Sequence, residues 1–368
     1  MRQAKVSMNR EQIGKRIKAV RRELNKKKID CLLVTKPANV TYTTGFMGDD
    51  SWAVITKRAV YLLTDSRYIE QAQTECIGCR IIQRKDSLAE AVAKLCKKLK
   101  SMRTVAVEKA TSVAAFEALK KRVKLRLKTT ADIIESVRRI KDNSEIAAIK
   151  AAASISAKAL EQILGCIKPG VTECELAGVL DFQIRRLGAT NSFETIVAFG
   201  PNASRPHHQP SKRKLRKRDT VLIDFGARYK GYCSDITRSF AVGKPTRFFE
   251  KVYDAVQQAQ AAAIKTVKAG VEIVQVDAAA RRVISKYDLP VYGHGTGHGF
   301  GLEIHESPFL KADGKGRLRA GEVITIEPGV YIPGKLGVRI EDDILVTETG
   351  CRILTRNCPH SPMLAHIR

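Results

Sequence analysis

The stretch Val221-Leu222-Ile223-Asp224-Phe225-Gly226 sets an acidic residue inside an otherwise apolar segment. Aspartate is disfavoured in strands, and a carboxylate buried in one is costly unless it is paired or bound to a metal. A second strand-like run, Asp235-Ile236-Thr237-Arg238-Ser239-Phe240, begins with another aspartate. A four-residue turn at 228–231 would place Asp224 directly opposite Asp235, where two side chains share a face with Cβ atoms about 5 Å apart.

The same arrangement recurs nearer the C-terminus. Strands are expected over Thr325–Ile332 and Gly337–Val346, and Pro333-Gly334-Lys335 forms the loop between them. A hairpin centred on this loop places Glu327 opposite Glu341. The two facing pairs bring four carboxylates together, and divalent cations would remove their mutual repulsion.

The alternative is that these acids pair with arginines, for which Arg238 and Arg339 are candidates. For a single acidic pair this is the simpler interpretation. Two matched pairs together with a histidine favour a metal centre, and His298 can donate one imidazole nitrogen to it. His298 lies in a glycine-dense segment, 291–301, that misses G-x-G-x-x-G in every register and so does not predict dinucleotide binding. His208 is interpreted as a structural histidine.

Carboxylate oxygens with one imidazole suit manganese, with cobalt, iron or zinc as alternatives. Two such metals about 3.5–4 Å apart would activate water near neutral pH and stabilise the oxyanion formed when it attacks. The sequence contains no H-E-x-x-H, G-x-S-x-G or P-loop motif. Zincin, α/β-hydrolase and P-loop functions therefore have no support.

Alternating strands and helices predict an α/β fold in two domains, residues 1–140 and 141–368. The first contains a strand at 31–35 and a hairpin formed by 53–56 and 60–64. In the second, capping boxes at 142–145 and 172–175 begin long helices. A second helix pair, divided at Lys268-Ala269-Gly270, repeats the first pair and its following acidic strand, which predicts a duplicated unit with pseudo-two-fold symmetry.

The composition indicates a globular chain with a basic surface. Hydrophobic residues make up 44% of the 368 residues, and the net charge is +27. No apolar run approaches the length of a membrane span, and an odd number of cysteines, nine, favours a reducing compartment, so we expect a cytoplasmic protein with no membrane partner. The charge permits weak, non-specific nucleic-acid binding, although the low aromatic content (6%) favours a merely solvated surface.

Several ordered motifs resemble the Xaa-Pro peptidases, the aminopeptidase P and prolidase branch of the pita-bread metallopeptidases. The N-terminal segments at 39–46 and 63–68 are similar to a creatinase-like domain, so the resemblance covers nearly the whole chain. The motifs of the second domain are Ile223-Asp224-Phe225-Gly226, Ser234-Asp235-Ile236-Thr237-Arg238, His294-Gly295-Thr296-Gly297-His298-Gly299, Glu303-Ile304-His305-Glu306, Ile326-Glu327-Pro328-Gly329 and Arg339-Ile340-Glu341-Asp342.

The resemblance implies a role for each matching position. Asp224 would bind one metal, His298 and Glu327 would bind the other, and Asp235 and Glu341 would bridge both. Glu327 would also take a proton from the attacking water. The resemblance also implies that His207, His294 and His305 contact substrate and that Arg339 supports the metal ligands. The basic run 212–218 departs from the family and is expected to form a solvated hairpin tip.

The resemblance implies a homodimer that releases an N-terminal residue from peptides with proline at the second position. Three other functions are open. A dipeptidase would act only on Xaa-Pro dipeptides. A creatinase-like hydrolase would not need the metal ligands, so their presence counts against it. A non-catalytic binding module of the same fold would be expected to have lost them.

Overall fold

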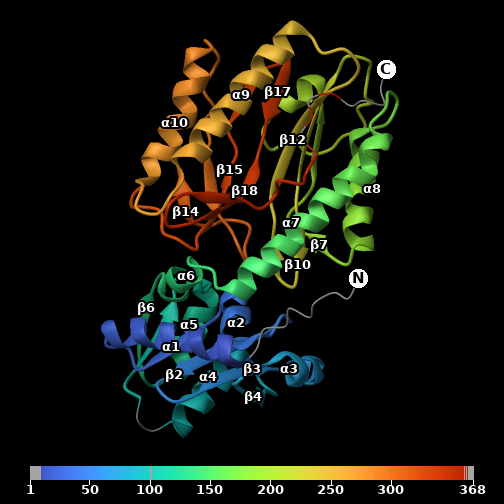
Figure 1. Cartoon of the computed structure of the whole chain (residues 1–368). Coiled ribbons are helices and arrows are strands. Elements are labelled where there is room, and N and C mark those ends of the chain that lie inside the picture. Colours follow the sequence, from blue (N-terminus) through green and yellow to red (C-terminus); the bar gives the residue numbers. More distant parts are fainter. Residues whose placement is uncertain (1–9, 100–101, 360, 362, 364–368) are drawn as a thin grey trace. The chain divides into compact units, whose positions relative to one another are not determined.

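A computed structural model describes residues 10–99, 102–359, 361 and 363 (Figure 1). They form two compact units that divide between Arg138 and Arg139. Within the described part of the chain, no helix is both long and apolar enough to cross a membrane. The nine cysteines all lie among the described residues, and no disulfide joins any of them there.

The first unit is built on a six-stranded mixed sheet in the order β4-β3-β2-β1-β5-β6. The expected hairpin is confirmed, because Ile55 pairs with Val60 across the short turn between β2 and β3. The strands are β1 (Cys31–Val34), β2 (Trp52–Thr56), β3 (Val60–Thr64), β4 (Arg80–Gln83), β5 (Thr104–Glu108) and β6 (Arg126–Thr130). The helices are α1 (Arg10–Lys26), α2 (Pro37–Thr44), η1 (Ser66–Tyr68), α3 (Ile69–Glu75), α4 (Leu88–Lys98), α5 (Val113–Arg122) and α6 (Ile133–Arg138).

The second unit contains two pairs of long helices with strands between the pairs (Figure 1). Both predicted capping boxes are present, one at the start of α7 and one at the start of α8. Each helix pair packs against its own group of strands in a separate hydrophobic cluster. The helices are α7 (Asn143–Ile163), η2 (Leu164–Cys166), α8 (Glu173–Arg186), η3 (Gly200–Ser204), α9 (Arg247–Thr266) and α10 (Ile273–Lys286).

The strands of the second unit form several small antiparallel sheets. The acidic residues lie in or next to two of them, the sheet β12-β9-β8 and the sheet β14-β13-β15-β18-β19. Asp224 lies within β9, whereas Asp235, Glu327 and Glu341 lie directly beside the ends of β12, β15 and β18. The strands are β7 (Thr190–Asn191), β8 (Ile196–Phe199), β9 (Thr220–Phe225), β10 (Ala227–Tyr229), β11 (Tyr232–Cys233), β12 (Ile236–Ala241), β13 (Gly297–Gly299), β14 (Glu306–Leu310), β15 (Val323–Ile326), β16 (Gly329–Ile332), β17 (Leu336–Arg339), β18 (Asp342–Val346) and β19 (Cys351–Ile353).

Matched hydrogen bonds confirm the predicted duplication. The amide of Gly170, after α7, donates to the carbonyl of Leu215 (2.9 Å), and the amide of Gly270, after α9, donates to that of Leu318 (2.9 Å). Both glycines adopt positive φ (101° and 85°), which side chains resist. Each half therefore closes its helix pair with the same backbone contact to the segment that leads into its acidic strand.

The expectation for the basic run 212–218 is only partly correct, because five of its seven side chains are exposed but the run is held against the domain and is not a free hairpin tip. The segment lies along the loop between α7 and α8, and the amide of Leu215 donates to the carbonyl of Val171 (2.8 Å). Leu215 is buried in the hydrophobic cluster of this half. Arg213 is half-buried and forms an ion pair with Asp219 (2.9 Å). An apolar residue and a paired arginine thus hold the run against the domain.

Candidate metal centre

The first acidic hairpin has a different register from the one expected. Asp224 in β9 pairs with Thr237 in β12, not with Asp235. The turn consists of only two residues, Lys230 (φ 51°) and Gly231 (φ 83°), which is typical of a type I′ hairpin turn. The four-residue turn was therefore wrong, and the true pairing is displaced by two residues. Because a displacement of two preserves the face, Asp235 still points to the side of Asp224.

The second acidic hairpin has the expected register. Ile326 pairs with Asp342 on one side of the acids, and Gly329 pairs with Arg339 on the other. The pairs on both sides keep one register, so Glu327 and Glu341 occupy opposed positions as expected. The expected continuous strands are nevertheless broken at these acids, Glu327 lying between β15 and β16 and Glu341 between β17 and β18.

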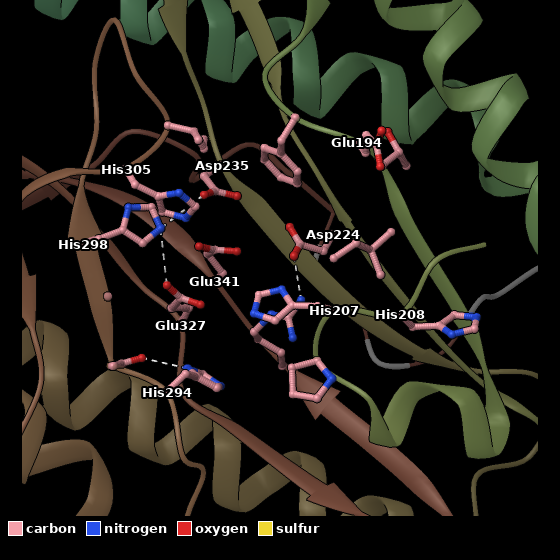
Figure 2. A pocket seen from close by; sticks show the side chains of 18 of the residues that line it. Glu194, His207, His208, Asp224, Asp235, His294, His298, His305, Glu327 and Glu341 are labelled. Atoms are coloured by element: carbon pink, nitrogen blue, oxygen red, sulfur yellow. Dashed lines mark hydrogen bonds and ion pairs between the residues drawn. The ribbon is translucent and has the colours of Figure 1, made fainter. Parts of the chain in front are cut away.

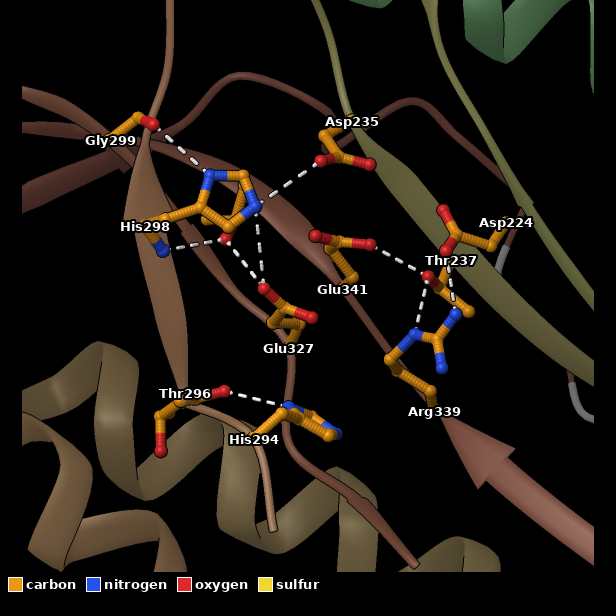
Figure 3. Close-up of polar contacts among 12 residues, drawn as sticks. Asp224, Asp235, Thr237, His294, Thr296, His298, Gly299, Glu327, Arg339 and Glu341 are labelled. Atoms are coloured by element: carbon orange, nitrogen blue, oxygen red, sulfur yellow. Dashed lines mark hydrogen bonds and ion pairs between the residues drawn. The ribbon is translucent and has the colours of Figure 1, made fainter. Parts of the chain in front are cut away.

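The two hairpins and the glycine-dense segment meet at one site (Figure 3). Ligand atoms of Asp235, His298 and Glu341, all buried, lie within 4.8 Å of one another. The His298 Nε2 atom is 3.5 Å from Asp235 Oδ2 and 3.5 Å from Glu327 Oε1. Four of the five expected ligands thus form one tight group around the imidazole.

Asp224 lies beside this group and is held by an arginine. The Arg339 guanidinium donates to Asp224 Oδ2 (2.6 Å), while Asp224 Oδ1 is buried and has no hydrogen-bond partner among the described residues. The alternative that the acids pair with arginines is therefore correct for Asp224 Oδ2. Arg238 instead forms an ion pair with Asp342 (2.8 Å). A buried carboxylate oxygen without a partner is costly, and a metal ion would satisfy it.

Burial and mutual repulsion control the charge of the site. Burial, followed by the negative charges of Glu327 and Asp224, raises the pKa of Glu341 well above its ordinary value. Burial and Glu341 do the same to the pKa of Asp235, and burial raises the pKa of Glu327 to about 7. Burial lowers the pKa of His298, so its imidazole is neutral and able to act as a ligand. Divalent cations fit this donor set because they would offset the repulsion.

The other expected site residues line a cavity of about 510 Å³ above the ligands (Figure 2). The ring of His305 lies 4.5 Å from that of His298, in an edge-to-face arrangement. His207 is exposed in the cavity, and His294 contacts the Tyr331 hydroxyl through Nε2 (2.9 Å). His208 is bonded to Glu173 (2.8 Å), which confirms its structural interpretation.

A family model described as metallopeptidase family M24 matches residues 147–348, more than half of the chain. The chain belongs to metallopeptidase family M24. A second model, the creatinase/prolidase N-terminal domain, matches residues 16–140 of the same chain. This M24 chain is therefore a hydrolase, and its candidate metal site lies within the matched peptidase domain.

Proteins similar to this M24 peptidase cover almost its whole length. An uncharacterised peptidase of Bacillus subtilis is 39% identical over 91% of this chain and 94% of its own. A solved Xaa-Pro dipeptidase from Bacillus anthracis is 38% identical with a TM-score of 0.92, covering 95% of this chain and 99% of its own. A solved X-Pro aminopeptidase from Thermotoga maritima is 35% identical with a TM-score of 0.86, and the match covers 93% of this chain and 99% of the aminopeptidase chain.

Sequence reasoning missed three residues of this M24 peptidase that bind the expected metal ligands or Arg339. The Thr237 hydroxyl donates to Glu341 (2.7 Å) and accepts from Arg339 Nε (3.0 Å). Thr325 donates to Glu327 (3.2 Å), and Tyr331 accepts from Arg339 (2.8 Å). Strand alternation is a signal for the two threonines, since each lies two residues from a ligand and so on the same face. Tyr331, four residues from Glu327, follows the same period.

The metal-free M24 peptidase is expected to be less stable as pH rises from 4.5 toward 7. Because folding raises the pKa of Glu327 from its ordinary 4.5 to about 7, the folded state binds more protons in this window than the unfolded state. In the presence of a chelator, the melting temperature should therefore fall between pH 4.5 and pH 7 more steeply in wild type than in Glu327→Gln. Identical pH dependence in the two proteins would contradict this charge assignment.

Proposed function

We propose that this M24 peptidase is a dinuclear-metal aminopeptidase that releases the N-terminal residue from peptides with proline at the second position. The observation that carries the proposal is the convergence of five donors at the base of one cavity. These donors are Asp224, Asp235, His298, Glu327 and Glu341. The similar proteins from Bacillus anthracis and Thermotoga maritima, an Xaa-Pro dipeptidase and an X-Pro aminopeptidase, support this substrate class.

The donors divide naturally between two metals. Asp224 would hold one metal, His298 and Glu327 would hold the other, and Asp235 and Glu341 would contribute to both. When bound, the metals lower the pKa of water and polarise the scissile carbonyl. The oxygen-rich donor set suits manganese, with cobalt, iron or zinc as alternatives.

The protein's own side chains would orient the reactants and move the proton. Glu327 takes a proton from the attacking water. His305 and His207 donate hydrogen bonds to the substrate, His305 where negative charge develops on the carbonyl oxygen. Arg339 holds Asp224 in place through Nη2, with its Nη1 fixed by Tyr331.

The cavity offers separate surfaces for the two ends of an Xaa-Pro unit. The cationic amine of the substrate would approach the acidic end, near Asp224. Apolar side chains offer a proline ring a dry surface beyond the scissile bond. They are Phe193, Ile196, Ile304 and Phe309.

A dipeptidase is the second candidate, favoured by the similarity to the Bacillus anthracis enzyme. A non-catalytic binding module is disfavoured because all five donors are present and one Asp224 oxygen has no partner within the part of the chain that the structure describes. We further propose a cytoplasmic homodimer.

A peptide panel tests the proposed function. Xaa-Pro, Xaa-Pro-Xaa, Met-Ala-Xaa and Xaa-Ala-Xaa peptides are incubated with the purified protein and Mn²⁺. We expect cleavage of both proline-containing peptides, and faster cleavage of the tripeptide than of the dipeptide. Cleavage of the dipeptide alone would establish a dipeptidase, and equal cleavage of the alanine peptides would contradict proline selectivity.

The basic surface is expected to bind nucleic acid weakly without affecting catalysis. The exposed cations of the basic run are to be replaced by serine or glycine, while the buried Leu215 and the paired Arg213 stay. Binding of a random-sequence oligonucleotide should weaken, and wild-type binding should fade steeply as salt rises, because each phosphate contact releases counterions. A large loss of turnover would show that this segment shapes the active site. The replaced residues are Lys212, Lys214, Arg216, Lys217 and Arg218.

A further inference from the structure

The carboxylate of Glu173 is a fully buried charge that takes no part in the metal centre. It is the first residue of α8 and accepts hydrogen bonds from five donors. Oε1 accepts from the Phe199 amide (2.7 Å) and Asn202 Nδ2 (2.8 Å). Oε2 accepts from His208 Nε2 (2.8 Å), the Ser211 amide (2.9 Å) and the Ser211 hydroxyl (2.5 Å).

The two oxygens hold the two ends of one loop. The loop is the segment 199–211, the first part of the connection from β8 to β9. Oε1 binds residues where this segment leaves β8, and Oε2 binds His208 and Ser211 at its other end. Between them, residues 206–210 line the cavity, and His207 is exposed within it (Figure 2). His207 therefore lies on a segment whose two ends share the Glu173 carboxylate as an acceptor.

The pseudo-symmetry of the domain shows that this carboxylate is not needed for the repeated framework. The position equivalent to Glu173, three residues after the matching glycine, is Ile273. The amide of Glu173 donates to the carbonyl of Arg213 (3.2 Å), and the amide of Ile273 donates to that of Gly316 (3.1 Å). The backbone contact is thus conserved between the halves, while the carboxylate occurs only in the half that carries His207.

The surroundings of Glu173 keep it ionised. Burial by itself raises its pKa, but bonds from Ser211, His208, Asn202 and the Phe199 amide together hold that pKa below its ordinary value. The N-terminal end of α8 also favours a negative charge. An ionised carboxylate accepts from all its neighbours, whereas an amide in its place would turn two hydrogens toward donors.

We propose that Glu173 is a positioning residue that holds the 199–211 loop closed and thereby sets His207 against the substrate. Its effect on turnover rests on the proposed function, while its effect on the loop does not. Loss of the tether should leave the metal ligands intact, because none of them lies on this loop.

The first test is amide hydrogen exchange of the metal-free protein, comparing Glu173→Gln with a matched control. Glu175→Gln makes the same change two residues along α8, where Glu175 caps the helix by accepting from Thr172. Exchange in 199–211 should accelerate roughly tenfold to a hundredfold in Glu173→Gln, the change expected when a hydrogen bond to a charged group is lost. It should be unchanged in Glu175→Gln. Equal exchange of this loop in the two variants would overturn the proposal.

The second test is a double-mutant cycle on cleavage of an Xaa-Pro-Xaa peptide. Glu173→Gln alone should lower kcat/KM by about tenfold, with normal metal content. In a His207→Ala background the same change should have an effect of less than about twofold, because the group that it positions is gone. Equal losses in both backgrounds would show that Glu173 acts independently of His207 and would overturn the proposal.

A second variant and the loop-exchange measurement cover the cases in which Glu173→Gln does not fold or the wild type is inactive. If Glu173→Gln does not fold, Ser211→Ala removes one donor and should give a smaller increase in loop exchange and a smaller loss of kcat/KM. No change in either quantity would then count against the proposal. If wild type with Mn²⁺ cleaves no Xaa-Pro peptide, the proposed function fails, and loop exchange still decides whether Glu173 is the tether.

Discussion

Replacing Glu341 by alanine is expected to remove both metals and lower kcat/KM by about a thousandfold or more. Glu341 lies at the centre of the site, within 4.8 Å of ligand atoms of both Asp235 and His298. Loss of metal catalysis costs several kcal/mol of transition-state stabilisation, and about 1.4 kcal/mol corresponds to a tenfold change in rate. Metal content by mass spectrometry and kinetics on an Xaa-Pro-Xaa peptide measure the two effects.

Companion variants test how the ligands are shared. Asp235→Ala should also lose both metals, whereas His298→Ala should weaken mainly one. Glu348→Ala is the matched control, because it removes an exposed glutamate shortly after β18 and should change neither metal content nor rate. Equal metal retention in the three ligand variants would show that the assignment is wrong.

Chelation gives the same result without a mutation. Activity should disappear with a chelator and return when Mn²⁺ or Co²⁺ is added. Full activity in a preparation shown to be metal-free would exclude the two-metal mechanism.

Replacing His305 by alanine is expected to lower kcat by roughly a hundredfold or more, the scale of losing one donor to a developing oxyanion. Partial desolvation of the ring and the neighbouring His298 lower the pKa of His305, so at neutral pH the ring is uncharged and donates through one nitrogen only. Its contribution should be larger in the transition state than in the ground state, so kcat should fall more than KM rises. Steady-state kinetics on an Xaa-Pro-Xaa peptide measure both.

Melting temperature and metal content distinguish a catalytic role of His305 from a purely structural one. The residue is exposed, so His305→Ala should keep a normal melting temperature and normal metal content. His305→Gln retains a donor and should recover part of the lost rate. A lowered melting temperature with wild-type kcat would contradict a catalytic role for His305 and would also count against the proline-peptidase proposal.

Local sequence patterns determined much of the fold. Capping boxes predicted the starts of α7 and α8, and acidic residues in apolar strands predicted which strands carry the site. Strand alternation was sufficient to place each acid on a face, because the side-chain period of a strand is two. For this reason the wrong register of the first hairpin still brought Asp224 and Asp235 to the same side.

The register itself depended on the turn. Lys230 and Gly231 both adopt positive φ, and this conformation permits a two-residue loop where a four-residue turn was expected. The register of the second hairpin was predicted correctly because the expected three-residue loop is the one observed. Ile332 pairs with Leu336 across it, and the central Gly334 adopts positive φ (69°).

Only the tertiary structure decided which partner each charge has. Arg339 pairs with Asp224 while Arg238 pairs with Asp342, although both arginines were equal candidates in the sequence. The run 212–218 was expected to be solvated, yet Leu215 is buried and Arg213 is paired with Asp219. The ion pairs of Arg339 and Arg238 join residues far apart in the chain. Periodicity and capping describe only neighbours within one element, whereas a long-range contact forms when several elements pack together and bury it.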